Sequence, residues 1–192
     1  MKLSFMYKTF RDRWEQYQQF WMFSDPHFGD TELREGMRAE GRWHPNDEET
    51  INRINQKIGK KDIFCCLGDV GNPEWIKKIR AGYKILVLGN HDAGVANYLP
   101  FFDEVYEGPV FVGEKLVFSH EPLDFSFAKN IHGHLHQGKL HPDKNHINVC
   151  ADIIDYKPLP LGELLYNSPL SEIQSLHRQT IDGATERKRN RK

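Results

Sequence analysis

Short apolar runs alternate with polar segments along the first half of this chain. Three of the runs, at residues 20–23, 63–67 and 84–88, are four or five residues long, which is a usual length for a buried strand. The polar stretches between them have the spacing of amphipathic helices. This alternation is typical of parallel strands with helices on the faces of the sheet.

Two helices are expected between the early strands. The first begins at a cap, Asn46 or Asp47, and runs to Gly59, with isoleucines three or four residues apart on its buried face. The second is short, covers residues 74–80 and follows Pro73, a residue that suits the first position of a helix.

The second half of the chain has shorter apolar runs and a different order of elements. Helices are expected over residues 161–166 and 170–179, and short strands over residues 101–106, 110–112, 115–119, 129–131 and 145–150. We expect a single domain over residues 18–180, preceded by an N-terminal extension (residues 1–17) and followed by a basic C-terminal tail (residues 181–192). Residues 28–46 read as a long connection that handles substrate.

Composition narrows the class of protein. A net charge of −1 argues against a surface that coats nucleic acid, so we expect no stable nucleic-acid complex. Cys65, Cys66 and Cys150 are too few for a disulfide framework, and we expect them to be reduced and to lie inside strands, away from the site loops. The sequence has no visible secretory signal or membrane-spanning run, so we expect a cytoplasmic protein with no membrane partner.

Side chains that can bind metal ions follow the apolar runs at several places. Asp25 and His27 are two residues apart, so an extended backbone directs both to one side. Ligand groups on parallel sheets gather beyond the carboxyl ends of the strands. The candidates that follow predicted strands, several of them beside a glycine, are Asp25, His27, Asp69, Asn90, His91, His120, His134 and His136.

The chemistry of this set indicates metal binding. Carboxylate, imidazole and amide oxygen suit Mn²⁺, Fe or Zn²⁺ better than Ca²⁺ or an all-thiolate zinc site. Seven ligands are too many for one ion but enough for two that share a carboxylate. Two such cations, roughly 3.5–4 Å apart, can clamp a phosphoryl group and generate a bound hydroxide.

In this order the motifs resemble those of the calcineurin-like metallophosphoesterases, nearest to the small, cap-less bacterial and phage members. The resemblance spans about residues 19–157 and rests on Asp25-Pro26-His27, Gly68-Asp69, Gly89-Asn90-His91-Asp92, His120 and Gly133-His134-Leu135-His136. It implies an α/β fold, a four-layer α/β/β/α sandwich of two mixed sheets flanked by helices. It also implies two divalent cations, with Mn²⁺ expected first and Fe, Zn²⁺ or Ni²⁺ as alternatives.

The resemblance also implies a role for each ligand. Metal one would take Asp25, His27 and His136, and metal two would take Asn90, His120 and His134, while Asp69 would bridge them. A hydroxide between the metals would attack phosphorus, and His91, which ligates neither metal in the family, would assist the leaving group.

One position departs from the family pattern. Many members have a second acid three residues after the bridging one, and it orients the catalytic histidine; here that residue is Asn72. An amide can hold an imidazole but cannot stabilise its cation as a carboxylate does, so His91 would be a weaker acid or would rely on another carboxylate. We assign His91, Asp92 and Asn72 to the catalytic group.

Substrate contacts are expected from Arg42, Asn90 and His91. Candidate phosphate contacts in the long connection are Arg34, Arg38, Arg42 and His44, although for any single one of them the sequence favours solvated surface charge. The expected substrate is a phosphate ester, for example a nucleotide or a cyclic nucleotide.

Three functions agree with these observations. The first is a dinuclear metal-dependent phosphohydrolase that cleaves phosphodiesters. The second is a nuclease or phosphomonoesterase of the same family. The third is a catalytically weak or inactive metal-binding scaffold that binds a protein, although a chain that keeps all seven ligands and His91 favours an enzyme.

Overall fold

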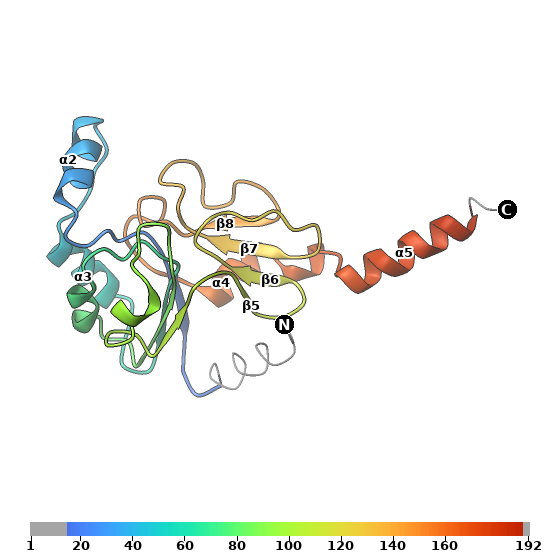
Figure 1. Ribbon diagram of the computed structural model, residues 1–192, viewed down its shortest axis with the longest axis horizontal. Coiled ribbons are helices and arrows are strands. Elements are labelled where there is room, and N and C mark those ends of the chain that lie inside the picture. Colours follow the sequence, from blue (N-terminus) through green and yellow to red (C-terminus); the bar gives the residue numbers. More distant parts are fainter. Residues whose placement is uncertain (1–14, 190–192) are drawn as a thin grey trace.

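The computed structural model describes residues 15–189 (Figure 1). Most of the expected N-terminal extension and the last three residues of the expected basic tail lie outside these residues. Two sheets pack against each other, and buried apolar side chains of both form one core cluster. The rings of Phe20 in the first sheet and Phe118 in the second have centroids 5.9 Å apart, so the core lies between the sheets.

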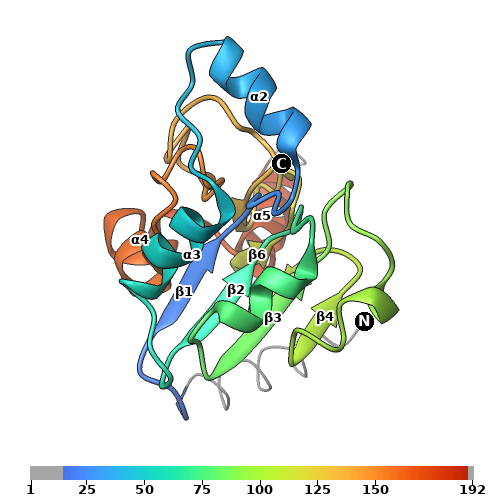
Figure 2. The same ribbon diagram turned by 90° about the vertical axis from the view of Figure 1, so that its left-hand side faces the viewer.

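The first sheet has five strands in the order β4-β3-β2-β1-β9. Strands β1 (Phe20–Phe23), β2 (Ile63–Cys66), β3 (Tyr83–Val87) and β4 (Glu104–Tyr106) run parallel, and β9 (Leu159–Pro160) pairs antiparallel with β1. The expected strands here are confirmed, whereas β9 was not expected. Because the parallel strands end at one edge, the loops that follow β1, β2 and β3 meet there (Figure 2).

The second sheet has four strands in the order β5-β6-β7-β8. Its strands are β5 (Val110–Phe111), β6 (Leu116–Phe118), β7 (Lys129–His132) and β8 (His146–Asn148). Strand β5 pairs antiparallel with β6, while β6, β7 and β8 are parallel. The expected fold class, two mixed sheets with flanking helices, is therefore confirmed.

The observed helices agree with the helices expected from the sequence less closely than the strands do. The expected helix after Asn46 is α3 (Asp47–Asn55), where the Asn46 side chain accepts a hydrogen bond from the backbone N–H of Glu49 (2.8 Å). It ends four residues before Gly59, although Ile58 is still buried. The expected short helix is a 3₁₀ helix, η1 (Pro73–Lys78), and a further one, η2 (Val95–Asn97), follows the loop after β3.

The sequence suggested a long connection without a helix at residues 28–46. The structure contains a helix there. This helix is α2 (Thr31–Ala39), capped by the Asp30 side chain, which accepts from the backbone N–H of Leu33 (2.9 Å). Two of its residues, Arg34 and Met37, are buried. Its two large apolar residues, Leu33 and Met37, are four apart and share one face, but charged residues dominate the segment, which explains why it was read as a connection.

Three helices end the chain. The expected α4 (Leu161–Asn167) is present and packs on β1. The expected helix at 170–179 is wrong: a 3₁₀ turn, η3 (Leu170–Glu172), is followed by α5 (Leu176–Arg189), which extends away from the body of the molecule (Figure 1). No helix within residues 15–189 is both long and apolar enough to cross a membrane.

Candidate metal centre

Unusual backbone angles turn several candidate ligands toward one place. Asp25, His27, Asp69 and His134 have φ values of 57°, 43°, 51° and 65°, a region that residues with a side chain rarely adopt. Backbone hydrogen bonds join the loop after β1 to the loop after β2, from Asp25 N–H to the Gly68 oxygen (3.0 Å) and from His27 N–H to the Asp69 oxygen (3.0 Å). These bonds hold both loops in their strained conformation.

Glycines allow the loops from the two sheets to come this close. A Cβ at Gly133 would lie 2.0 Å from the Ser24 hydroxyl oxygen and 2.3 Å from Oδ2 of Asp25. At Gly68, whose φ is 98°, a Cβ would lie 2.6 Å from the backbone of Gly89. The glycines of the motifs are therefore required by the packing of backbone and ligand side chains at the site.

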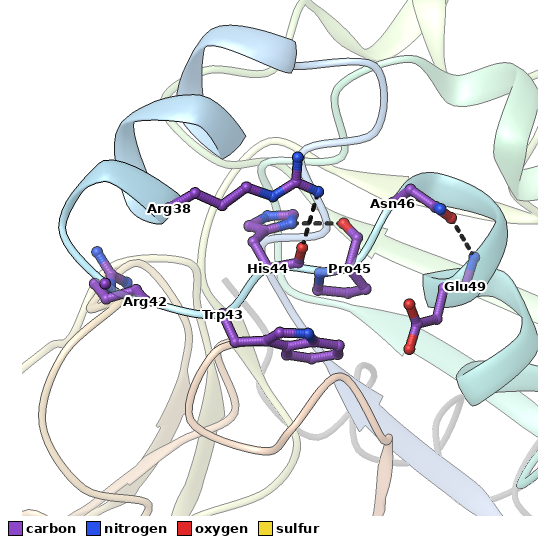
Figure 3. A pocket seen from close by; sticks show the side chains of 8 residues that line it. Arg38, Arg42, Trp43, His44, Pro45, Asn46 and Glu49 are labelled. Carbon is purple, nitrogen blue, oxygen red and sulfur yellow. Dashed lines mark hydrogen bonds between the residues drawn. The ribbon is translucent and has the colours of Figure 1, made fainter.

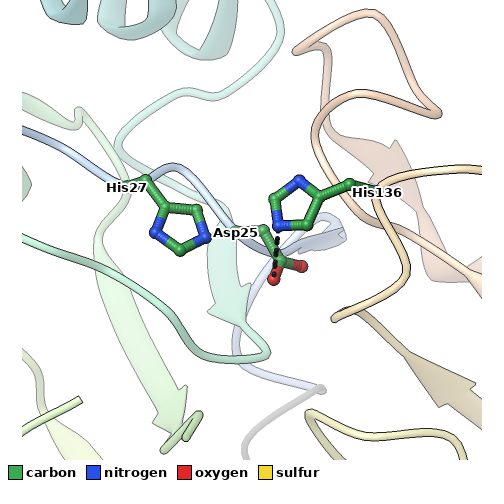
Figure 4. A group of neighbouring side chains, drawn as sticks. All are labelled: Asp25, His27 and His136. Atoms are coloured by element: carbon green, nitrogen blue, oxygen red, sulfur yellow. Dashed lines mark ion pairs between the residues drawn. The ribbon is translucent and has the colours of Figure 1, made fainter. Parts of the chain in front are cut away.

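The first group of ligand atoms comes from Asp25, His27 and His136 (Figure 4). One donor atom from each lies within 4.8 Å of the others, and Oδ1 of Asp25 is 3.8 Å from Nε2 of His136. Asp25 and His27 are 1% and 6% exposed. The group combines residues from the loop after β1 with one from the loop after β7.

The second group comes from Asp69, His120 and His134, and Asn90 lies against it. Oδ1 of Asn90 is 2.8 Å from Nε2 of His120 and 3.2 Å from Nδ1 of His134. His120 Nδ1 is 2.8 Å from the backbone oxygen of Leu67, so the Nδ1–H tautomer donates there. This leaves the Nε2 lone pair of His120 directed at the group, the form in which an imidazole binds a metal.

Asp69 lies between the two groups. Its Oδ2 is 3.6 Å from Nε2 of His27 in the first group and 3.4 Å from Nε2 of His120 in the second. Its other oxygen accepts a hydrogen bond from the backbone N–H of His91 (3.0 Å), which fixes the carboxylate and the loop after β3 together. The position suits a carboxylate shared by two cations.

His136 is oriented by a carboxylate that the sequence analysis did not assign. Asp152 Oδ2 is 2.6 Å from Nδ1 of His136, so Nε2 of the imidazole faces Asp25. Burial works to lower the pKa of His136, but the hydrogen bond with Asp152 and the charges of Asp25 and Asp152 outweigh it and raise the pKa above its ordinary value. The sequence signal was an acid just after a predicted strand.

Cys150 corrects one expectation about the cysteines. Cys65 and Cys66 lie inside β2 as predicted, but the Sγ atom of Cys150 is 3.6 Å from Nδ1 of His136, beside the first group. Burial raises the pKa of the Cys150 thiol well above its usual range. His136, Cys150 and Asp152 form a third set of donor atoms within 4.8 Å of one another, so the thiol adjoins the site.

The donor atoms fit divalent cations. Oδ1 of Asp25 and Nε2 of His27 are buried and have no hydrogen-bond partner. Burial of polar atoms without a partner is costly, and a cation between them would supply the missing interaction. Burial lowers the pKa of His27, which favours the neutral imidazole that binds metal.

The three residues assigned to catalysis occupy different surroundings. His91 is exposed beside the first group, with its ring centroid 5.8 Å from that of His27. The Asp92 carboxylate accepts hydrogen bonds from the Tyr98 hydroxyl (2.9 Å) and from three backbone N–H groups, those of Asp69, Val70 and Gly89. Asp92 therefore fixes the loops that follow β2 and β3.

The Asn72 side chain has a different role. It accepts a hydrogen bond from the backbone N–H of Glu74 (3.1 Å), which caps η1.

Of the arginines in the connection, Arg42 touches the site. Its Nη2 donates to the backbone oxygen of His136 (3.0 Å) and lies 3.5 Å from Oδ1 of Asp152. Arg34 is buried and paired with Asp47, and His44 is buried and hydrogen bonded to the oxygen of Pro45. Those two side chains are unsuited to the phosphate contact suggested for them because they are already engaged within the protein.

Comparisons with known proteins agree with this geometry. A model of the family described as calcineurin-like phosphoesterase matches residues 19–171. The uncharacterized protein MJ1445 of Methanocaldococcus jannaschii is 29% identical over 166 residues, covering 75% of this chain and 88% of that protein.

One solved structure is similar in fold, and a second matches a shorter part of the chain. A protein of unknown function, AQ665 from Aquifex aeolicus, has a TM-score of 0.63 and 22% identity, over 76% of this chain and 97% of that chain. The nuclease MPE of Pseudomonas putida has a TM-score of 0.45 and 19% identity, over 62% of each chain.

Proposed function

This chain belongs to the calcineurin-like phosphoesterase family, and we propose that it is a dinuclear metal-dependent phosphodiesterase. The observation that carries the proposal is the position of Asp69. One of its carboxylate oxygens lies between His27 of one ligand group and His120 of the other, at 3.6 Å and 3.4 Å. Two ligand groups that share a carboxylate are what a pair of cations requires.

The ligand sets follow the two groups. We assign Asp25, His27 and His136 to the first cation, Asn90, His120 and His134 to the second, and Asp69 to both. When bound, the cations supply Lewis acidity toward phosphate oxygens and a hydroxide nucleophile. The mixture of carboxylate, imidazole and amide oxygen supports Mn²⁺, with Fe, Zn²⁺ and Ni²⁺ as alternatives.

The remaining residues act on the substrate. His91 is exposed next to the first group, where a protonated imidazole could donate to the departing oxygen. Arg42 lies beside His136 with its side chain partly exposed, so its guanidinium is available to a phosphate oxygen. Asn90 would serve both the second cation and the substrate. Asp92 keeps these groups in place through its backbone hydrogen bonds.

Other features support a cytoplasmic enzyme with one catalytic domain. The described cysteines Cys65, Cys66 and Cys150 are all free and buried, which supports a reducing compartment such as the cytoplasm. The family match covers residues 19–171, which supports one catalytic domain within residues 18–180. We propose nucleotides or cyclic nucleotides as substrates, with no stable nucleic-acid complex.

The test combines metal content with turnover. Protein loaded with Mn²⁺ should hold two ions per chain and hydrolyse bis(4-nitrophenyl) phosphate faster than 4-nitrophenyl phosphate. His120→Ala should lose one ion and most of the activity, whereas His177→Ala, which changes an exposed histidine on α5, should lose neither. Two bound ions without hydrolysis of any ester would instead identify a scaffold, and faster monoester cleavage would identify a phosphomonoesterase.

A further inference from the structure

Arg42 and Trp43 line two cavities, and one of these adjoins the first ligand group at His136. One, of about 370 Å³, also contacts His136, Asp152 and Tyr156. The other, of about 470 Å³, is lined further along the same segment by Arg38, Pro45 and Asn46 (Figure 3). A substrate phosphate beside His136 would therefore have room for an attached group next to Trp43.

Trp43 has the geometry of a stacking platform. Its side chain is one of the large apolar groups left open to solvent, with 52% exposure. The Arg53 guanidinium lies 4.4 Å from the ring centroid, and the Tyr156 ring meets the indole nearly at right angles, with centroids 5.8 Å apart. Arg53 is itself held by Glu49 and by Asp155, both at 3.0 Å. The indole is thus fixed before a ligand binds, which reduces the entropy lost on stacking.

A single exposed tryptophan needs no functional explanation by itself. What distinguishes Trp43 is the cation next to it in the sequence and the ligand group that shares its cavity. Arg42 Nη2 donates to the backbone oxygen of His136 (3.0 Å), so the segment that carries the indole is tied directly to the first ligand group. An aromatic face and a guanidinium beside a phosphate site are the usual elements for binding a nucleotide.

The cavity beside the second ligand group differs in the charge of the residues that line it. This cavity of about 250 Å³ next to Asn90 and His120 is lined by the exposed acids Glu107 and Glu121, and no arginine or lysine lines it among the described residues. Acidic side chains there would repel a second phosphate. The Trp43 side also has acids, Asp152 and Asp155, but Arg38 and Arg42 line the cavities there, so of the two sides it is the one that offers cations to a nucleotide phosphate.

We propose that Trp43 and Arg42 form a nucleobase subsite, in which a base stacks on the indole while the adjoining phosphate lies at the two ligand groups. The substrate class is then a small nucleotide diester or a chain-terminal nucleotide. This inference rests on the proposed phosphodiesterase function and adds its specificity.

The experiment compares two diesters with the same leaving group. Thymidine 5′-(4-nitrophenyl phosphate) carries a base, and methyl 4-nitrophenyl phosphate does not. Trp43→Ala should raise KM for the thymidine ester at least about fivefold, in keeping with the usual strength of base stacking, and leave the methyl ester unchanged. Trp43→Phe should restore most of the affinity, and Tyr166→Ala, which removes an aromatic ring that is 85% exposed elsewhere, should behave as wild type.

The outcomes separate this inference from the proposed function. If Trp43→Ala changes both esters equally, or neither, the subsite is wrong while the phosphodiesterase function stands. If wild type cleaves neither ester, the proposed function fails, and calorimetry of the Mn²⁺-loaded protein decides the subsite. Tighter binding of AMP than of ribose 5-phosphate, lost in Trp43→Ala, would support it; equal binding of the two would overturn it.

Discussion

Asp152 Oδ2 lies 2.6 Å from Nδ1 of His136, and this bond directs the other imidazole nitrogen at Asp25. The same carboxylate accepts from the Tyr156 hydroxyl (3.0 Å), and its side chain is only 8% exposed. Burial alone would raise the pKa of Asp152, but its hydrogen bonds to His136 and Tyr156, together with the nearby charges, bring it below the ordinary value. Asp152 therefore stays ionised and fixes the tautomer of His136, whose Nε2 faces the first ligand group.

Asp152→Asn should weaken metal binding at the first group. The amide keeps an acceptor for His136 but removes the charge that makes the imidazole a better ligand, and loss of such a partner typically costs about 10- to 100-fold in metal affinity. Competition with a fluorescent chelator measures the affinity of each ion. Asp124→Asn, at a fully exposed carboxylate, is the control, and an unchanged first-site affinity in Asp152→Asn would contradict the role.

Asp69→Asn should abolish tight binding of both ions. The Asp69 carboxylate faces His27 and His120, and without its charge the two cations would repel each other across a neutral amide. The amide keeps an oxygen for the His91 N–H, so the loop after β3 should remain in place. Metal analysis after gel filtration gives the stoichiometry. A variant that retained two ions and full activity would exclude the shared carboxylate.

His91→Ala should keep both ions and slow turnover, most of all for esters with poor leaving groups. His91 lies outside the two ligand groups, and an acid matters most when the departing oxygen is basic. General acid catalysis contributes about 10²- to 10⁴-fold, so the loss should be in that range for an alkyl ester and much smaller for a 4-nitrophenyl ester. A series of aryl and alkyl diesters tests this, and equal losses across the series would contradict an acid role.

His44→Asn should make folding stability less sensitive to acid. Burial lowers the pKa of His44 from its ordinary value of 6.5, so the folded protein resists a proton that the unfolded chain accepts. The free energy of unfolding contributed by this group is complete above pH 6.5 and is lost as the pH falls toward the lower pKa of the folded state.

The measurement for His44 is the urea midpoint at several pH values between 7.5 and 5. Asparagine keeps a donor for the Pro45 oxygen, which His44 Nδ1 contacts at 2.7 Å, but does not titrate. The difference between the two proteins isolates His44 from the other histidines. Parallel curves for wild type and variant would show that His44 does not titrate differently on folding.

Much of the fold could be predicted because the buried strands are short apolar runs with clear ends. Strands β1, β2 and β3 were found in this way, together with the polar residues that follow them. Helix α2 and strand β9 were missed: α2 is mostly polar, and the two residues of β9 carry no pattern that distinguishes a strand from a loop. Cys150 was misjudged because its neighbour His136 comes from a different loop.

The sequence by itself determined which residues could bind metal, because the ligand atoms belong to side chains. It also determined where these residues stand after each apolar strand. Tertiary structure decided which of them meet. Loops from two sheets converge at one edge. Asp69 therefore lies between His27 and His120, and Asp152 contacts His136. Trp43 lines the cavity next to His136. Such contacts join residues far apart in the chain, and their distances depend on how the sheets pack rather than on any local pattern.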